Sequence, residues 1–252
     1  MASLGHWPPR RAARELTGAA TVQMVVHCFG STTFFMAMLA GLEGVRSAVS
    51  SQVATHMVAP TGTRLKAGIH LPELLKSLGV ESLTAYVDTH ADWRDRLYDK
   101  FLQLFPEETK YCQSAVCHRI TFMYGLLYEH DQLNGATHDA LAEMFGVANI
   151  KAFEHLALMT RQGHLVKADG ADLYLPQVKR LAIPITFIHG AENQVFLPVS
   201  TEMTYNWLRE QNGTDLYSRY VIPHYGHIDC IFGKNAVADV YPLILQHLEA
   251  TK

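Results

Sequence analysis

The strongest constraint on the fold is the stretch VVHCFGS, residues 25–31, in which an apolar run stops at a cysteine and resumes after a short turn. Val22–His27 is a continuous β-prone run, as expected of a strand that is buried on both faces. Ser31–Leu42 is apolar and helical, and Gly44 lies where such a helix would end. The sequence therefore predicts a strand, a sharp turn and a helix, with Cys28 at the turn.

The order His-Cys-x-Gly between a strand and a helix is the pattern of a nucleophile elbow. We expect Cys28 to take a strained backbone conformation there, and Gly30 to let strand and helix approach each other. The helix N-terminus would lower the pKa of the thiol, and the backbone N–H of Phe29 would serve as an oxyanion donor. A free cysteine after an apolar strand is also commonly a small buried hydrophobe. The choice between a nucleophile and a buried apolar residue therefore depends on the other residues of the chain.

The expected elements alternate in a way that indicates an α/β protein with one parallel sheet and helices on its faces. Further strands are expected at Val45–Val53, Ile183–Gly190 and Tyr217–Ile222. Helices are expected at Arg10–Thr17, Val199–Gln211 and Ala236–Ala250. The second strand is the weakest of these because serines interrupt it.

The middle of the chain has a different character, with amphipathic helical patterns and no strong strand signal. Helices are expected there at Leu65–Leu78, Trp93–Phe105, Val116–His130, His138–Phe145 and Ile150–Gln162. We therefore expect residues 1–54 and 175–252 to form the α/β core and residues 55–174 to form a helical cap. Such a cap would lie over the carboxyl ends of the strands, where open α/β sheets bind their ligands.

Composition excludes several classes of protein. The chain has 252 residues, 48% of them hydrophobic, which suffices for a core and a cap. A net charge of -3 without a long basic cluster argues against nucleic-acid binding. No apolar run reaches the ~18 residues that a membrane span needs, and the N-terminal sequence lacks the apolar stretch of a secretory signal.

The four cysteines are too sparse for a disulfide scaffold. Cys112 and Cys117 are near enough in sequence for a local bridge, but free thiols in a reducing compartment are the expected state. No CxxC pair indicates zinc, and no HExxH pattern is present. We expect a cytoplasmic protein with no cofactor and no metal.

Two later loops supply the remaining parts of a catalytic constellation. HGAENQVFLP follows the third expected strand and YGHIDCIFG follows the fourth, so the chain order is Cys28, then Asn193 or Glu192, then His227. Asn193 can hold an imidazole tautomer by a hydrogen bond but brings no full charge, and Glu192 would substitute if the loop shifted by one residue. Asn193 could also simply shape a turn. Asp229 is a weaker alternative that fits better as an anchor of the last loop.

These three loops resemble the α/β-hydrolase superfamily over most of the chain. The segments LAGLEGVRSAVSSQ, VCHRITFMYG and GHIDCIFGKNA more narrowly resemble the hydrolase-like segment joined to flavin-dependent cholesterol-oxidase-type oxidoreductases. A flavin function does not carry over, because this sequence has no GxGxxG phosphate loop. The chain departs from the superfamily in its cysteine nucleophile, its acid position and the early position of the elbow.

The early elbow implies that the first strands of the family's sheet are missing, together with the loop that normally supplies the second oxyanion donor. Val22–His27 would then lie at a sheet edge, so we expect a homodimer that covers it. His27 and Phe196 are expected near the substrate. The predicted function is hydrolysis of small apolar esters or thioesters through an acyl-enzyme. The alternatives are acyl transfer at the same site, or a non-catalytic module that partners an oxidoreductase.

Overall fold

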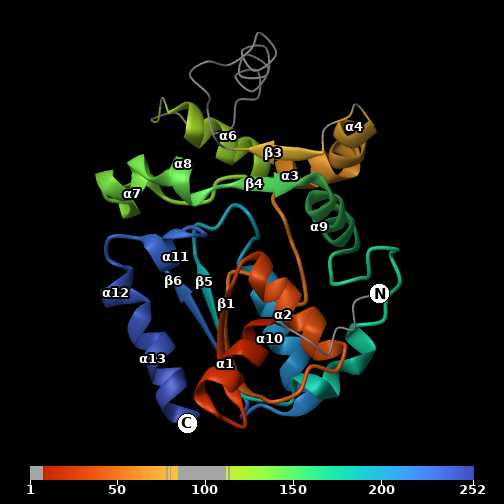
Figure 1. Ribbon diagram of the computed structural model, residues 1–252, viewed down its shortest axis with the longest axis vertical. Coiled ribbons are helices and arrows are strands. Elements are labelled where there is room, and N and C mark those ends of the chain that lie inside the picture. The colour runs from red at the N-terminus through yellow and green to blue at the C-terminus, as the bar shows by residue number, and fades with distance from the viewer. Residues whose placement is uncertain (1–7, 78, 80, 85–111, 113) are drawn as a thin grey trace.

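The computed structural model describes residues 8–77, 79, 81–84, 112 and 114–252, and a parallel sheet of four strands lies at its centre (Figure 1). The strands are β1 (Val22–His27), β2 (Val45–Ser51), β5 (Ile185–Gly190) and β6 (Tyr217–Ile222). They are hydrogen-bonded in the order β1-β2-β5-β6, and each neighbouring pair is parallel. All four carboxyl ends therefore lie at one edge of the sheet, as the sequence predicts.

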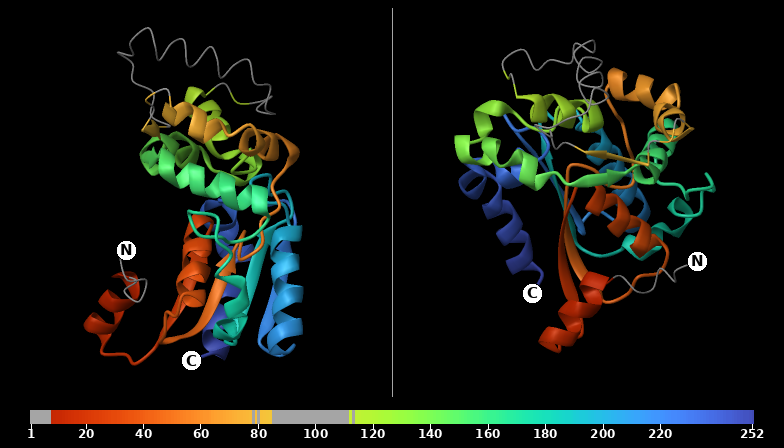
Figure 2. Two further views of the ribbon diagram at one scale, coloured as in Figure 1. Left: turned by 90° about the vertical axis from the view of Figure 1, so that its right-hand side faces the viewer. Right: turned by 45° about the horizontal axis from the view of Figure 1, so that its top comes forward.

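Helices cover both faces of this sheet (Figures 1 and 2). Their bounds are α2 (Phe29–Leu39), η2 (Leu175–Leu181), α10 (Val199–Asn212), α11 (Asp229–Phe232), α12 (Ala236–Asp239) and α13 (Tyr241–Ala250). Helix α1 (Pro8–Thr17) projects away from the sheet near the start of β1 (Figure 2). The core has one part on each face of the sheet, and β5 contributes to both because successive side chains of a strand point to opposite faces. Phe187 stacks on Phe35 of α2 with ring centroids 6.2 Å apart, whereas Ile188 packs in the cluster beside α12 and α13.

The serines that weaken the pattern of β2 are buried and hydrogen-bonded. Ser50 donates from Oγ to the carbonyl of Val53 at 2.9 Å, and the hydroxyl of Ser47 lies 2.7 Å from that of Thr251. A buried hydroxyl with a partner costs little, so these serines are compatible with a central strand.

The described part of residues 55–174 lies over the carboxyl edge of the sheet (Figures 1 and 2). Its elements are α3 (Thr61–Gly68), α4 (Leu71–Ser77), β3 (Ser82–Thr84), α6 (Ala115–Tyr124), η1 (His130–Gln132), α7 (Gly135–Asp139), α8 (Leu141–Met144), β4 (Val147–Asn149) and α9 (Ile150–Gln162). Strands β3 and β4 form an antiparallel pair that the sequence pattern does not reveal. The boundaries between core and cap stay a prediction.

Several expected helices are broken in the structure, and local residues explain where. The helix expected at Leu65–Leu78 divides into α3 and α4 at His70, whose φ is 55°. The helix expected from Val116 ends at Tyr124 because Gly125 takes a φ of 92°. The closing helix divides before Tyr241, where Pro242 occupies the first turn of α13 and cannot continue α12. The expected helix at residues 93–105 lies outside the described residues.

Strand β1 is an edge strand within the described part of the sheet, and Val25 on it is 46% exposed. The homodimer expected from this edge stays a prediction, which light scattering at micromolar concentration tests. Among the described residues, no helix combines the length and the apolar character that crossing a membrane requires.

Candidate active site

Cys28 lies at the turn between β1 and α2, with φ 53° and ψ -129°. A non-glycine residue in this region is strained, and such strain is typical of functional sites. The backbone of Cys28 is held on both sides: its N–H donates to Ser51 at 3.1 Å, and its carbonyl accepts from the N–H of Ser31 at 2.9 Å. Gly30 is not required for close approach, because a Cβ added there would meet nothing within 4 Å.

The thiol of Cys28 is neutral at physiological pH. Burial raises its pKa to about 11, and this effect outweighs the backbone N–H of Phe29, which lowers the pKa as a hydrogen-bond donor. The sequence predicts a lowered pKa from the helix end, so this expectation is wrong for the resting structure. Desolvation of a small thiol under the cap is the physical reason.

A cavity of about 160 Å³ opens beside Cys28 and Phe29. Among the described residues its walls are mainly apolar side chains of the cap, with Val195 and Phe196 from the loop after β5. The cap contributes Ala67, Leu75, Phe122, Phe153 and Leu156. Tyr124 also lines it, and Cys28 is close enough to contribute to the raised pKa of Tyr124, which burial dominates. Phe196 therefore lies where the sequence predicts a substrate contact.

His227 lies in the loop after β6 and is completely buried. Its N–H donates to the carbonyl of Leu127 in the cap at 3.1 Å. The loop packs directly on the end of β5, where a Cβ on Gly190 would come within 1.9 Å of the carbonyl oxygen of Gly226. Asp229 anchors the same loop by accepting the N–H of Gly226 at 2.8 Å, and burial raises the pKa of its carboxyl to about 6.

Of the two candidates for orienting His227, Asn193 is the one beside it. Nδ2 of Asn193 is 3.0 Å from Nδ1 of His227, and Asn193 is completely buried. Glu192 is exposed to solvent, and its backbone N–H donates to the carbonyl of Tyr225. The structure therefore brings Asn193 and not Glu192 to the imidazole.

The orientation of the Asn193 amide is fixed by its backbone neighbours. Oδ1 accepts two N–H groups, from Val195 at 2.8 Å and from Phe196 at 3.1 Å. An NH₂ group could not accept these bonds, so Nδ2 has to face the other way. Nδ2 then lies 2.8 Å from Oε1 of Gln52, an oxygen that also accepts the N–H of Gly190 at 3.0 Å.

A third atom near Nδ2 is Nε2 of His189, at 3.2 Å. This nitrogen lies 2.9 Å from the carbonyl of Phe196, which can only accept, so His189 carries its proton on Nε2. The two N–H bonds of the Asn193 amide therefore go to Gln52 and to His227.

This network determines the tautomer of His227. Nδ1 accepts from Asn193, so the proton of the neutral ring lies on Nε2. Burial, with the nearby rings of His27 and His189, holds the pKa of His227 well below its usual value, so the ring is neutral. Nε2 is buried and has no hydrogen-bond partner among the described residues, and no hydrogen bond joins it to Cys28. In this state His227 can donate a proton or a hydrogen bond at Nε2 but cannot accept one there.

His27 does not line the cavity, contrary to the expectation that it lies near the substrate. Its ring packs edge-on against that of His227 with centroids 5.0 Å apart, and its Nδ1 is 3.2 Å from the hydroxyl of Ser51. Sequence reasoning missed Gln52, which is buried with a φ of 79° and fixes the amide of Asn193. Its position directly after β2, at the carboxyl edge, is a signal that could have found it.

No family model matches the sequence, and the comparison with curated proteins finds no match. Solved structures match over nearly the whole chain. A highly thermostable carboxyl esterase from Bacillus coagulans superimposes with a TM-score of 0.57 at 14% identity, covering 96% of this chain and 68% of the esterase. A thermophilic esterase from Thermogutta terrifontis gives 0.54 at 10% identity, covering 95% and 69%.

The protein Rv0554 from Mycobacterium tuberculosis gives a TM-score of 0.50 at 18% identity and covers 96% of this chain and 70% of its own. Identities this low show the fold alone. The structural matches, together with the parallel sheet and the helices on both of its faces, define an α/β-hydrolase fold.

Proposed function

We propose that this protein hydrolyses esters or thioesters of small apolar acids through an acyl-enzyme on Cys28. The observation that carries the proposal is the strained backbone of Cys28 at the edge of an apolar cavity. A protein retains such strain only where the surrounding structure enforces it, and an elbow of this shape presents its side chain to a bound substrate.

In the proposed reaction Cys28 and Phe29 lie at the cavity, and His227 is buried beside Asn193. The sulfur of Cys28 attacks the acyl carbon and its proton passes to Nε2 of His227, while the N–H of Phe29 binds the oxyanion. The proton then passes to the leaving alcohol or thiol as its bond to the acyl carbon breaks. Water attacks the acyl-enzyme, gives a proton to His227, and the thiol leaves with that proton as the acid is released.

The resting tautomer of His227 makes this chemistry slow. Nε2 can take the thiol proton only when the ring proton lies on Nδ1, where it would face the Nδ2–H of Asn193. Losing that hydrogen bond costs about 1–3 kcal/mol, or one to two orders of magnitude in rate. Replacing the orienting aspartate by asparagine in a serine protease lowers kcat by about 10⁴ for the same reason.

A second candidate function is binding of an apolar acyl ligand without turnover. The donation from Asn193 to His227 favours it, because it leaves Nε2 of His227 protonated and unable to accept the thiol proton that hydrolysis requires. A non-catalytic module that partners an oxidoreductase, as the sequence resemblance implies, would be one form of this function.

Hydrolysis of p-nitrophenyl butyrate by the full chain and by Cys28→Ala and His227→Ala separates the two candidates. The hydrolase proposal requires that both variants lose the protein-dependent rate while circular dichroism shows an unchanged fold. Glu192→Gln, next to the network but exposed, is the matched control and should keep the rate. Equal rates in all four proteins, with retained binding of a fluorescent fatty acid, would contradict hydrolysis and support ligand binding.

A further inference from the structure

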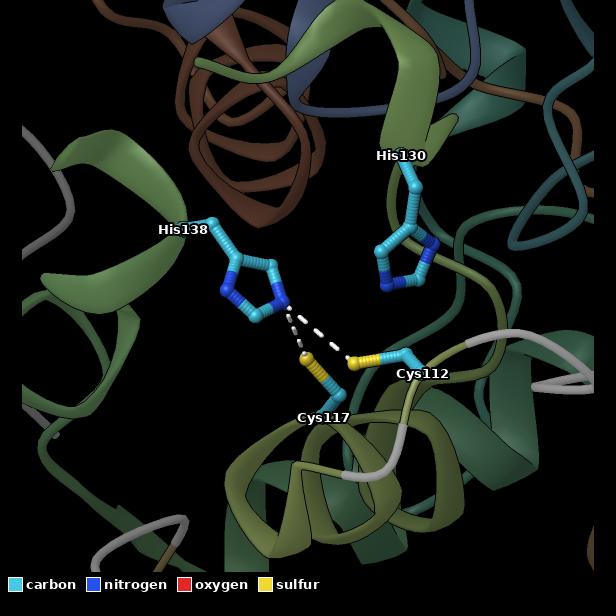
Figure 3. Close-up of side chains that lie close together, drawn as sticks. All are labelled: Cys112, Cys117, His130 and His138. Carbon is cyan, nitrogen blue, oxygen red and sulfur yellow. Dashed lines mark hydrogen bonds between the residues drawn. The ribbon is translucent and has the colours of Figure 1, made fainter. Parts of the chain in front are cut away.

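Two cysteines and two histidines of the cap converge at one point (Figure 3). Cys112 precedes α6, Cys117 lies within α6, His130 begins η1, and His138 lies in α7. One sulfur or ring nitrogen from each residue falls within 4.8 Å of those of the other three. Cysteine sulfur and histidine nitrogen are the ligands that bind zinc in structural sites.

The distances in the cluster suit a tetrahedral metal ion. Nε2 of His138 lies 3.2 Å from Sγ of Cys117 and 3.4 Å from Sγ of Cys112, and it faces both sulfurs in Figure 3. In a tetrahedral site with Zn–S bonds of about 2.3 Å and Zn–N bonds of about 2.0–2.1 Å, neighbouring sulfur and nitrogen ligands are about 3.5 Å apart. The ring centroids of His130 and His138 are 5.6 Å apart.

A second, independent observation comes from His130. Its Nε2 is buried and has no hydrogen-bond partner among the described residues, although nearly all buried polar atoms have one. A ring nitrogen that lacks a protein partner inside a cluster of three other ligand side chains is what a metal site presents before it is loaded.

The surroundings of the cluster resemble an outer coordination shell. Tyr128 donates from its hydroxyl to Sγ of Cys117 at 3.1 Å, and the N–H of Ser114 donates to Sγ of Cys112 at 3.5 Å. Nδ1 of His138 is 3.7 Å from a carboxylate oxygen of Asp139. Donors to thiolates and a carboxylate beside a ligating histidine are the partners that orient metal ligands.

We propose that Cys112, Cys117, His130 and His138 bind one zinc ion as a closed structural site. Two sulfurs and two nitrogens in a tetrahedron select zinc over the hard cations, and four protein ligands leave no position for a substrate. Zinc displaces the two thiol protons, so binding releases protons and is not a redox step. The chain spacing is C-x4-C-x12-H-x7-H, whose first part falls within the range of known zinc sites.

The site would fix the part of the cap that carries the cavity wall. Tyr124 and Leu127 line the cavity, and in the sequence they lie between the two cysteines and the two histidines. Leu127 accepts the N–H of His227, and Gln132 accepts that of Lys234, so the same segment holds the histidine loop. Zinc would therefore stabilise the cap and the position of His227 together.

Metal content of the full chain tests the proposal. The protein is purified under reducing conditions, incubated with zinc and freed of excess metal. Its zinc content is then measured by inductively coupled plasma mass spectrometry. We expect one zinc per chain, falling close to zero in Cys117→Ser and His138→Gln. Cys28→Ser and His164→Gln remove a cysteine and a histidine outside the cluster, and both should retain one zinc.

Cobalt substitution of the parent chain identifies the ligands by their spectrum, so the test does not fail if a variant folds poorly. The cobalt-loaded chain should show intense visible bands of a tetrahedral site and a thiolate charge-transfer band. Cys112→His should keep the metal and lose about half of the thiolate band. The proposal is overturned if the folded, reduced chain takes up no zinc or cobalt. It is overturned equally if Cys117→Ser still holds one equivalent, or if peptide mapping finds a Cys112–Cys117 disulfide in freshly purified protein.

Discussion

Asn193 donates a hydrogen bond from Nδ2 to Nδ1 of His227, over 3.0 Å, in a completely buried network. The catalytic histidine of a hydrolase needs the opposite arrangement, an acceptor at this position that holds the proton on Nδ1. The fold thus places a cysteine, an asparagine and a histidine at the expected strand ends, while the asparagine sets the imidazole in the unproductive tautomer.

The first prediction follows from this relationship. In Asn193→Asp a carboxylate oxygen would accept Nδ1–H of His227 and leave Nε2 free to take the thiol proton. We expect kcat/KM for p-nitrophenyl butyrate to rise about tenfold to a hundredfold, the rate that the resting tautomer costs. The carboxylate would also face Oε1 of Gln52, so the melting temperature should fall.

Glu192→Gln is the control for the first prediction, because it changes charge at the neighbouring exposed position. If Asn193→Asp stays folded and its rate does not exceed that of the parent, the tautomer of His227 is not what limits the reaction.

The second prediction concerns the thiol of Cys28. Because burial raises its pKa to about 11, alkylation by iodoacetamide should accelerate steadily above neutral pH without a plateau near pH 6–8. Peptide mapping assigns the label to Cys28, and the Cys28→Ala chain gives the background from the other cysteines. A pH-independent rate around neutrality would instead reveal a thiolate–imidazolium pair.

The third prediction is a loss of stability in acid. Burial lowers the pKa of His56, His27 and His189 from 6.5 to about 4. Between pH 4 and 6.5 the unfolded chain therefore binds more protons than the folded chain. The free energy of unfolding has its full value above pH 6.5 and falls as the pH drops toward 4. His56→Gln should reduce this slope by up to about 1.4 kcal/mol per pH unit, measured by urea unfolding. Identical slopes for the parent and the variant would contradict it.

Much of the fold could be predicted because its signals are local. Val22–His27 and Tyr217–Ile222 are strands with the predicted bounds, and Ile150–Gln162 is a helix with the predicted bounds. The breaks at His70 and Gly125 were missed, because an apolar pattern continues across them and only the backbone dihedral angles reveal the turns. The β3–β4 pair was missed because each strand is three residues long and one is mainly exposed.

The candidate site could be predicted in its residues and not in its chemistry. The order of Cys28, Asn193 and His227 along the chain indicates that they converge, but it cannot reveal which face of an amide points at a ring. That orientation depends on two backbone N–H groups and on Gln52, which lies far away in sequence. The cluster of Cys112, Cys117, His130 and His138 was missed likewise, because one C-x4-C pair is only half of a zinc pattern and the two histidines join it only in the fold.

The fourth prediction concerns substrate length. The cavity beside Cys28 is apolar, so each methylene that enters it should raise kcat/KM by up to roughly fourfold, equivalent to about 0.8 kcal/mol. Rates should increase from acetate to butyrate esters of p-nitrophenol. Leu156→Trp would fill part of the cavity and shift the preference back to acetate. A parent that prefers acetate would show that acyl chains do not enter this cavity.

The most direct test of the proposed function is the mass of the protein during turnover. The chain is mixed with p-nitrophenyl butyrate, quenched in acid, and measured intact and after digestion. The proposal predicts one butyryl group on the peptide that contains Cys28, absent from Cys28→Ala and more abundant at early times in Asn193→Asp. If the parent releases p-nitrophenol at a rate that Cys28→Ala matches, and carries no butyryl group at any time, Cys28 is not the nucleophile.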